Sequence, residues 1–591
     1  MAKTFTPNPK QEQAIEHIHG PMLVLAGAGT GKTSVLVERI ARLIENKLAA
    51  PEEILAITFT DNAAGEMKER VEKRLGRKTA ISAATFNAYC QGVLKRNGKD
   101  FHVLIPEDVY VFLRQKIEQL QLERFIKPAD VGEFLYDLRN FFDRCHEELV
   151  GPEGFQAFVD TLRASPDLPR NCRSKEVDKV GAQEILNRWR EIARVYTNAM
   201  RLLQQDNLGT FGMQISQAVQ LLEADPQLLA RERRRARFIL VDEFQDCNSS
   251  NIILTQLLAG DEQNIFAVGD PDQAIYRFRG ASSAAFEEFQ NRFPQTKAVT
   301  LEENQRSRGS ILRVAFAAIN ENPGVSSVSS STNLRRVPLQ SGRDLRDQQE
   351  GRLVFDEPVE ISISASDAQE AADIAEQIVQ LQRNRRGREQ YSMAVLYRSH
   401  ANREKLMEEL AAREIPFLVK AMDVLDTAVV RDVLAVARAV ANDGDAESLF
   451  RMCAFPQFSI AAPELRQKLS GAANKSTFKS VLATLEGGSR VLASVESART
   501  FITQPPIGVA AIFDYLVRTF DLPQQDLALK ALLRFVAEWE QKPYIREQSL
   551  RTFLEYVELF EEAGGFVPLL TDDQLQEAAM DNPDAVQLMT V

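Results

Sequence analysis

The chain has 591 residues, of which 44% are hydrophobic and 26% are charged, as in ordinary folded globular proteins. At roughly 150 residues per domain, this length predicts about four domains. The formal charge of −12 speaks against a protein that coats nucleic acid through its overall positive charge, although it allows a local basic groove. No apolar run approaches the ~18 residues that a membrane helix needs. The first residues, MAKTFTPNPK, lack the apolar core of a signal peptide, so we expect a cytoplasmic protein without a membrane partner.

Short apolar runs recur along the chain, and each is followed by a helical pattern. They cover residues 22–26, 54–59, 238–242, 264–269 and 392–397. Continuous apolar strands are typical of parallel sheets that helices cover on both faces. The helix expected after the first run has one apolar face, made of Leu36, Ile40, Leu43 and Ile44. The sequence therefore predicts an α/β fold with crossover helices.

Two long stretches interrupt this alternation. Residues of about 100–225 and 441–575 have a helical pattern with little strand signal, which predicts two helical inserts in the α/β framework. Between them, the Ser-, Gly- and Arg-rich segment 321–351 is typical of a surface loop or linker.

The sequence AGAGTGKT at 26–33 follows the first apolar run and opens a helix, which is the context of a phosphate-binding loop. Glycines let backbone N–H groups surround a phosphate, and the helix N-terminus attracts negative charge. Lys32 is expected to bridge the β and γ phosphates, and Thr33 to bind Mg²⁺. The candidate nucleotide-binding residues are Ala26, Gly27, Ala28, Gly29, Thr30, Gly31, Lys32 and Thr33.

An acidic pair follows the apolar run at 238–241. Asp242 is expected to hold Mg²⁺, and Glu243 to orient and deprotonate the water that attacks the γ-phosphate. A lone Asp-Glu pair is usually surface charge. Its place after an apolar strand, in a chain with a phosphate loop, favours the catalytic interpretation and predicts a nucleoside triphosphate hydrolase.

A third polar motif, GDPDQAIYRFRGA at 269–281, also follows an apolar run. Its aromatic side chains alternate with arginines, as in proteins that stack single-stranded bases and hold phosphates. A polar loop with a core Tyr and Phe is the other interpretation of these residues alone.

Together, VDEFQD, GDPDQAIYRFRGA and LEENQRS follow AGAGTGKT in the order found in one family. The chain resembles the UvrD/Rep/PcrA group of superfamily 1 DNA helicases over essentially its whole length. NPKQEQA at 8–14 looks like the family's adenine-reading motif, and TFTDNAAGEM at 58–67 and ATFNA at 84–88 look like its DNA-contacting motifs. The resemblance implies ATP and Mg²⁺ as cofactors. It implies single-stranded and duplex DNA as partners, together with repair or recombination proteins.

The resemblance also assigns roles by position. Gln11 would hydrogen-bond adenine, Gln273 would sense the γ-phosphate and couple it to DNA, and Arg306 would act as an arginine finger. We take Glu243, Gln273 and Arg306 as the catalytic set, with Arg306 also binding nucleotide. The expected DNA-binding residues are Phe59, Asn87, Tyr276, Phe278 and Arg279.

The family fold has two RecA-like P-loop motor domains, each carrying a helical insert. For this chain we expect the second motor domain to be incomplete. The expected ranges are 1–98 and 226–305 for the first motor domain, 99–225 for its insert, 306–440 for the second motor domain, 441–578 for its insert, and 579–591 for the start of a returning strand.

The chain departs from the family pattern at two places that matter. Gln305 stands where the family usually has a Tyr that stacks on adenine, and a lost stacking ring costs roughly 0.5–1.5 kcal/mol. After VQLMTV at 586–591, the family continues with the motifs HxxKGLEF and QxxRLxYVAxTR. We therefore expect a member truncated before its last motifs.

The sequence supports three hypotheses of function. The first is a UvrD-type helicase or translocase that couples ATP hydrolysis to 3′ to 5′ movement on single-stranded DNA and to duplex unwinding. The second is an ATP- and DNA-binding fragment or regulator without helicase activity. The third is the motor part of a helicase–nuclease resembling AddA or RecB.

Overall fold

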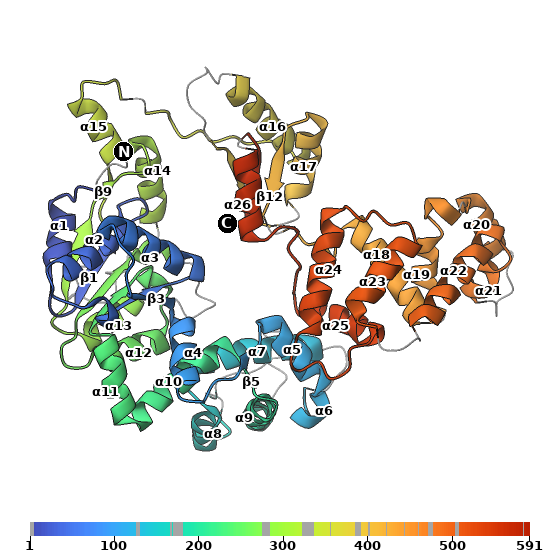
Figure 1. Cartoon of the computed structure of the whole chain (residues 1–591), viewed down its shortest axis with the longest axis horizontal. Coiled ribbons are helices and arrows are strands. Elements are labelled where there is room, and N and C mark those ends of the chain that lie inside the picture. Colours follow the sequence, from blue (N-terminus) through green and yellow to red (C-terminus); the bar gives the residue numbers. More distant parts are fainter. Residues whose placement is uncertain are drawn as a thin grey trace. The chain divides into compact units, whose positions relative to one another are not determined.

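A computed structural model describes most of the chain. The described residues are 5–125, 131–165, 168, 181–274, 284–321, 336–354, 356–383, 392–399, 402–420, 422–442, 444–458, 460–470, 477–502, 507–582 and 584–590. The chain divides into two compact units, whose elements are labelled in Figure 1. The first unit comprises residues 1–109 and 115–360, and the second comprises residues 110–114 and 361–591.

The first unit is built around a six-stranded sheet in which all strands are parallel. The strands are β1 (Met22–Ala26), β2 (Ile54–Thr58), β3 (Ser82–Thr85), β6 (Phe238–Val241), β7 (Ile265–Gly269) and β8 (Lys297–Leu301). Their order in the sheet is β3-β2-β6-β7-β1-β8. Every residue of β1, β2, β6 and β7 is buried, which is why these strands are continuous apolar runs in the sequence. The predicted α/β fold with a parallel sheet is confirmed.

Helices flank the strands of this sheet: most follow a strand, as expected for crossover connections, and two precede β1 and β6. They are α1 (Pro9–Glu16), α2 (Lys32–Glu45), α3 (Asp61–Leu75), α4 (Phe86–Arg96), α11 (Pro226–Arg235), α12 (Ser249–Ala259) and α13 (Ala284–Arg292). The predicted apolar face of α2 is buried in the core of the unit, with Leu36 and Ile40 fully inaccessible. After β8 come β9 (Glu303–Asn304), α14 (Gly309–Asn320), β10 (Gln340–Ser341) and α15 (Gly342–Gln349). The predicted loop at 321–351 is therefore wrong for residues 342–349, which form a helix, and residues 322–335 lie outside the described part.

The first insert is helical, as its pattern predicted. Its helices are α5 (Pro106–Gln115), α6 (Ile117–Leu120), α7 (Val131–Glu147), α8 (Pro152–Thr161), α9 (Ala182–Gln205) and α10 (Phe211–Ala224), and it also has the two-residue strands β4 (His102–Val103) and β5 (Leu208–Gly209). Aromatic rings hold α7 and α9 together, since Phe142 stacks on Tyr196 with ring centroids 4.9 Å apart.

The second unit has a small parallel sheet and a large helical part. The sheet order is β11-β13-β12, with β11 (Ala394–Tyr397), β12 (Phe417–Val419) and β13 (Val586–Thr590). Helices α16 (Asp367–Arg383) and α17 (Arg403–Ala412) contribute Ala375 and Leu410 to the core of this sheet. The returning strand expected after residue 579 is β13, which lies in the middle of the sheet because it pairs with both other strands.

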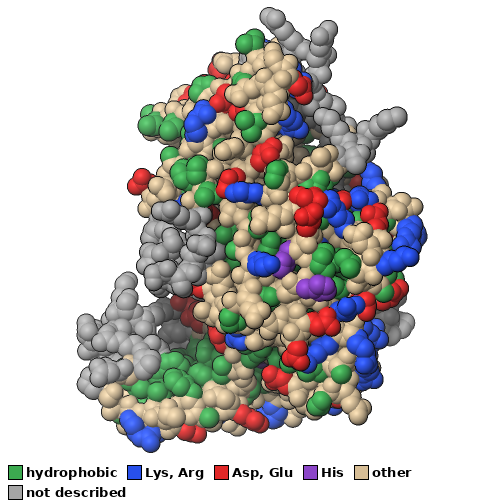
Figure 2. Space-filling view, turned by 90° about the vertical axis from the view of Figure 1, so that its left-hand side faces the viewer, with side chains coloured by type: hydrophobic (Ala, Val, Ile, Leu, Met, Phe, Trp, Pro, Cys, Tyr) green, Lys and Arg blue, Asp and Glu red, His purple; other side chains and the backbone are tan. Residues whose placement is uncertain are grey.

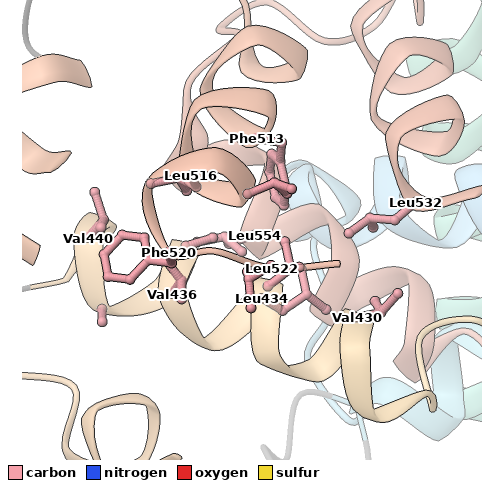
Figure 3. Close-up of a cluster of buried hydrophobic side chains, with 14 of the residues drawn as sticks. Val430, Leu434, Val436, Val440, Phe513, Leu516, Phe520, Leu522, Leu532 and Leu554 are labelled. Carbon is pink, nitrogen blue, oxygen red and sulfur yellow. The ribbon is translucent and has the colours of Figure 1, made fainter. Parts of the chain in front are cut away.

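The helical part of the second unit has a core of its own. Its helices are α18 (Ala428–Ala441), α19 (Ala446–Met452), α20 (Ala462–Ser470), α21 (Phe478–Leu482), α22 (Glu486–Ile502), α23 (Val509–Thr519), α24 (Leu527–Glu540), α25 (Leu550–Glu562) and α26 (Asp572–Asp581). Val430, Leu434 and Val440 lie along α18 in one buried cluster with Phe513 and Leu554 of neighbouring helices, and Val440 lies beside Phe520 (Figure 3). The structure thus has helical segments where both inserts were predicted.

The boundary between the compact units falls at residue 360, whereas the second motor domain was expected to begin at residue 306. Residues 306–360 group with the first unit, in which β10 pairs with β9 and Arg336 forms an ion pair with Asp272 after β7. The other domain boundaries stay predictions.

In the part of the chain that the structure describes, no helix is both long and apolar enough to cross a membrane.

Charged side chains of both signs are intermingled on the face of the molecule shown in Figure 2.

A chain of ion pairs links three helices of the first unit. Arg42 of α2 contacts Glu12 of α1 and Glu38 of its own helix, and Arg74 of α3 contacts Glu38. The Glu38 side chain is only 8% exposed, so solvent screens its ion pairs with Arg42 and Arg74 less than it screens a surface ion pair. Together the three ion pairs help to fix α1 and α3 against α2.

His146 is a buried imidazole between α7 and α10. Its Nδ1 lies 3.2 Å from the Ser216 hydroxyl, and its Nε2 has no hydrogen-bond partner among the described residues. Burial lowers the pKa of His146 to about 4, because the charged form would lose its hydration.

We expect this histidine to destabilise the fold in acid. The unfolded chain has a histidine pKa of ~6.5, so between about pH 6.5 and 4 the unfolded state binds a proton that the folded state does not. Stability should fall by up to about 1.4 kcal/mol per pH unit through this range and should be independent of His146 above it. The His146→Gln variant should show a shallower decline in urea unfolding measured from pH 7.5 to 4.5, and equal slopes in the two proteins would contradict the assignment.

Candidate functional site

The candidate site lies where three neighbouring strands of the first sheet end. In the order β6-β7-β1, the carboxyl ends carry Asp242, Asp270 and the loop at 27–31 respectively. Ligands of open parallel sheets bind at this edge, because the loops after the strands meet there. The strand order therefore brings together three motifs that are far apart in the sequence.

The loop between β1 and α2 has the backbone of a phosphate cradle. Gly29 and Gly31 have φ of 75° and 89°, a left-handed conformation that favours glycine. A Cβ on Gly29 would lie 2.7 Å from Cβ of Arg306, so a side chain there would also clash. Thr30 closes the loop by donating from its hydroxyl to the Gly27 carbonyl at 2.8 Å. The predicted residues 26–33 thus run from the last residue of β1 through this turn into the first residues of α2.

The acidic pair faces this loop. The Lys32 ammonium forms an ion pair with Oε2 of Glu243, and the Lys32 side chain is only 10% exposed. The same Oε2 accepts a hydrogen bond from Nε2 of Gln245 at 2.7 Å. Glu243 has a left-handed backbone with φ of 48°, an uncommon conformation for a residue with a side chain. The phosphate-gripping and base residues predicted from separate motifs are in direct contact.

Asp242 lies deeper in the same site. Its backbone N–H donates to the carbonyl of Ile57 of β2 at 2.9 Å, and the Thr33 side chain lies near its carboxylate. Burial, with the nearby Glu243 carboxylate, raises the pKa of Asp242 to about 6. A cation beside this carboxylate would offset the free-energy cost of ionising it in a buried position.

The donor chemistry of Thr33 and Asp242 fits Mg²⁺. A hydroxyl and one carboxylate are hard oxygen donors, and Mg²⁺ in nucleotide sites is commonly held by one or two protein oxygens, water and phosphate. Among the described residues no group of three or more His, Cys, Asp or Glu is arranged to hold a metal ion. The residues present thus suit a metal that arrives with a nucleotide.

The segment after β7 is folded on itself. Gln273 donates from Nε2 to Oδ2 of Asp270 at 2.7 Å, and burial raises the pKa of Asp270. Asp272 forms an ion pair with Arg336 at 2.5 Å. Gln273 therefore lies at the same edge of the sheet as the phosphate loop, with its amide bonded within its own turn, and its predicted role as a γ-phosphate sensor stays a prediction.

A buried asparagine fastens the LEENQRS segment onto the phosphate loop. Asn304, 1% exposed, donates from Nδ2 to the Ala28 carbonyl at 2.5 Å. Its Oδ1 accepts from the backbone N–H groups of Arg306 at 2.8 Å and Ser307 at 2.6 Å. The N–H of Gln305 donates to the Gly29 carbonyl at 2.7 Å. The structure thus places Arg306, exposed at its tip, beside the loop that it was predicted to assist.

Gln11 also touches the phosphate loop. Its Nε2 donates to the Thr30 carbonyl at 3.0 Å, and its Oε1 accepts from the N–H of Asn8, the N-cap of α1. Asn8 in turn donates to Glu303 at 3.0 Å. Both ends of the Gln11 amide are used inside the protein, so the adenine contact expected for it stays a prediction.

A cavity of about 660 Å³ adjoins the start of the phosphate loop. The loop backbone at Gly27 and Ala28 forms one side, and Phe316 and Ile319 of α14 form another. Gln273 lines it as well. The cavity is therefore continuous with the predicted site.

The candidate DNA-binding residues are only partly described. Phe59, at the end of β2, is 39% exposed, and Asn87 of α4 donates to the Phe211 carbonyl at 2.8 Å and to Gln214 at 3.0 Å. Both lie on the half of the sheet formed by β2 and β3. Tyr276, Phe278 and Arg279 lie outside the described residues.

Two site residues were not predicted from the sequence, Asn304 and Gln245. Both belong to motifs that were recognised, LEENQRS and VDEFQD. The sequence signal that could have identified them is that each is a polar residue inside a recognised motif, next to residues that had already been given roles. Each is buried, at 1% and 3% exposure, and such a residue needs partners that the tertiary structure alone provides.

A parallel sheet with a phosphate loop after β1 and an acidic pair after β6 defines a P-loop nucleotide-binding protein. Comparison with known families narrows this class. The model of the UvrD/REP helicase N-terminal domain matches residues 7–294, and the model of the UvrD-like helicase C-terminal domain matches residues 299–480. The chain belongs to the UvrD-like helicase family.

Similar proteins carry a consistent name. The ATP-dependent DNA helicase PcrA of Staphylococcus aureus strain Mu50 is 29% identical over 462 residues, and that of Staphylococcus epidermidis strain ATCC 12228 is 30% identical over 463 residues. Each alignment covers 77% of this chain and 56% of the relative. The chain thus spans about half the length of the relatives that it matches.

We expect Asn304→Ala to weaken both the fold and the nucleotide site. The change leaves two backbone N–H groups and the Ala28 carbonyl without their partner, at a cost of about 1–3 kcal/mol in stability. Affinity for a fluorescent ATP analogue should fall as well, because the phosphate loop loses its support. Asn320→Ala, an exposed asparagine of α14, is the matched control and should change stability by less than about 0.5 kcal/mol. Equal effects of the two substitutions in thermal denaturation and titration would refute this role.

Proposed function

We propose that the protein is a DNA-dependent ATPase that moves along single-stranded DNA in the 3′ to 5′ direction and unwinds duplex DNA. The single observation that supports this most is the contact of Lys32 with Glu243, which puts a phosphate-binding cation and a general base in one site. The family membership supports DNA as the track. The names of the relatives, ATP-dependent DNA helicases, agree with this class of activity.

In the proposed mechanism, the loop at 27–31 and Lys32 bind the triphosphate. Lys32 then exchanges its partner Glu243 for phosphate oxygens, which frees that carboxylate to accept a proton from the attacking water. Arg306, whose Cβ lies beside Gly29, offsets the charge that develops on the transferred phosphoryl group. Thr33 and Asp242 would hold Mg²⁺, which neutralises phosphate charge when bound.

Hydrolysis is coupled to DNA through the strand ends. Gln273 and Asp270 follow β7, which lies between the strand of the phosphate loop and the strand of Glu243. A shift of this turn would reach the predicted DNA residues that follow it in sequence. The exposed Phe59 contributes a stacking surface for a base.

We further propose that Gln11 reads adenine, that the protein acts in the cytoplasm, and that repair or recombination proteins are its partners.

ATP turnover tests the enzyme. Lys32→Ala and Glu243→Gln should each lower the rate of ATP hydrolysis in the presence of single-stranded DNA by at least about 100-fold. Lys32→Ala should also weaken ATP binding, whereas Glu243→Gln should not, because only Lys32 grips the ground-state phosphates. Lys73→Ala, at an exposed position of α3, should hydrolyse ATP at the wild-type rate.

The same assay separates the alternatives. A wild-type chain that binds ATP tightly without turnover, with or without DNA, would contradict the motor and favour a nucleotide-binding regulator. Strand displacement tests direction, since a duplex with a 3′ single-stranded tail should be unwound and one with a 5′ tail should not.

DNA binding tests the role of Phe59. Phe59→Ala should weaken affinity for a fluorescent oligothymidylate by about 1–3 kcal/mol, the usual contribution of one stacked base. ATP affinity without DNA should not change. Phe566→Ala removes a ring of similar exposure from the second unit and serves as the control. An unchanged DNA affinity in Phe59→Ala would remove this residue from the DNA site.

A further inference from the structure

We propose that Gln245 is a positioning residue that holds the carboxylate of Glu243 in the orientation required of a general base. This inference rests on the proposed ATP hydrolysis and adds a residue to it. Gln245 follows the acidic pair by two positions, at the short turn Phe244–Asp246, and its side chain is 3% exposed. The inference follows from the partners of its amide group.

The two ends of the Gln245 amide connect two strand ends. Its Nε2 donates to Oε2 of Glu243 at 2.7 Å, and its Oε1 accepts from the backbone N–H of Asp270 at 2.9 Å. The first bond is to a charged group and the second is to the backbone just after β7. A side chain fixed at one end by the sheet can therefore orient the base at the other.

Close packing leaves this amide little freedom. A Cβ on Gly269 would lie 2.7 Å from Oε1 of Gln245 and 3.0 Å from the N of Phe244. Gly269 thus lets β7 approach the turn closely enough for the Asp270 N–H to reach Gln245. The amide has donor and acceptor both paired, so its flip would lose two hydrogen bonds.

Lys32 and Gln245 both bind the Glu243 carboxylate, and this competition explains why the bond from Gln245 matters. In the structure, Lys32 and Gln245 share the same carboxylate oxygen. Under the proposed function, the triphosphate draws Lys32 away, and Gln245 is then the partner that remains from the described contacts of Glu243. Without this bond, the Glu243 carboxylate would keep neither of its described partners at the moment of reaction.

A positioning role predicts a specific kinetic effect. Loss of the bond should lower kcat for ATP by about 10-fold or more, since hydrogen bonds to charged groups are strong. KM for ATP should stay within about 2-fold, because the hydrogen bonds of the Gln245 side chain go to Glu243 and Asp270 and not to the phosphate loop in the described part of the chain. A defect in folding would instead reduce the active fraction without changing the preference for the transition state.

The test compares two substitutions of this residue. Gln245→Met keeps the size and removes both polar ends, while Gln245→Glu keeps an acceptor for the Asp270 N–H and removes the donor to Glu243. Both should lower DNA-stimulated kcat, and both should bind ATPγS like the wild type but ADP with aluminium fluoride more weakly, by the factor lost in kcat. If Gln245→Met fails to fold, Gln245→Glu still tests the donor.

Controls separate the outcomes. Gln256→Met removes a half-buried glutamine that bonds Arg292 and should keep the wild-type kcat. In the Glu243→Gln background, Gln245→Met should cost nothing further, because the group that it positions is gone. An active wild type with unchanged kcat in both Gln245 variants, or additive losses in the double variant, would overturn the proposal while leaving the ATPase in place. An inactive wild type would overturn both.

Discussion

The ion pair between Lys32 and Glu243 is the interaction on which the functional site depends. It forms only if β6 lies two places from β1 in the sheet, with β7 between them. The Lys32 side chain is only 10% exposed, so its charge would be costly to hold there without a partner, and the more exposed Glu243 carboxylate offsets that charge. Under the proposed mechanism, this pair must open before catalysis, because Lys32 would bind phosphate and the Glu243 carboxylate would accept a proton from water.

Buried amides extend this arrangement to the rest of the edge. Gln245 joins Glu243 to the end of β7, Asn304 joins the phosphate loop to residues 305–307, and Gln11 joins α1 to Thr30. None of these amides is charged, so each can be paired completely by hydrogen bonds. The result is a site in which three strand ends and one later segment are fixed relative to a single loop.

The sequence predicted the first sheet well because its strands are buried on both faces. Four of the five apolar runs became β1, β2, β6 and β7, and the fifth became β11 of the second unit. Strands with weaker apolar character, such as β3 and β8, were not predicted, since half-exposed positions dilute the signal. Residues 342–349 were expected to be a loop because of their polar composition, yet they form α15, whose N-cap Ser341 supplies the start signal.

The sequence by itself determined the chemistry: a phosphate loop, an acidic pair and their family, because these need fixed residue types at fixed short spacings. The tertiary structure decided how those groups meet. That Lys32 bonds Glu243, that Gln245 is shared between Glu243 and Asp270, and that Asn304 holds residues 305–307 against Ala28 depend on strand order and close packing. Such contacts join residues up to 276 positions apart, and no local pattern encodes a distance across a folded sheet.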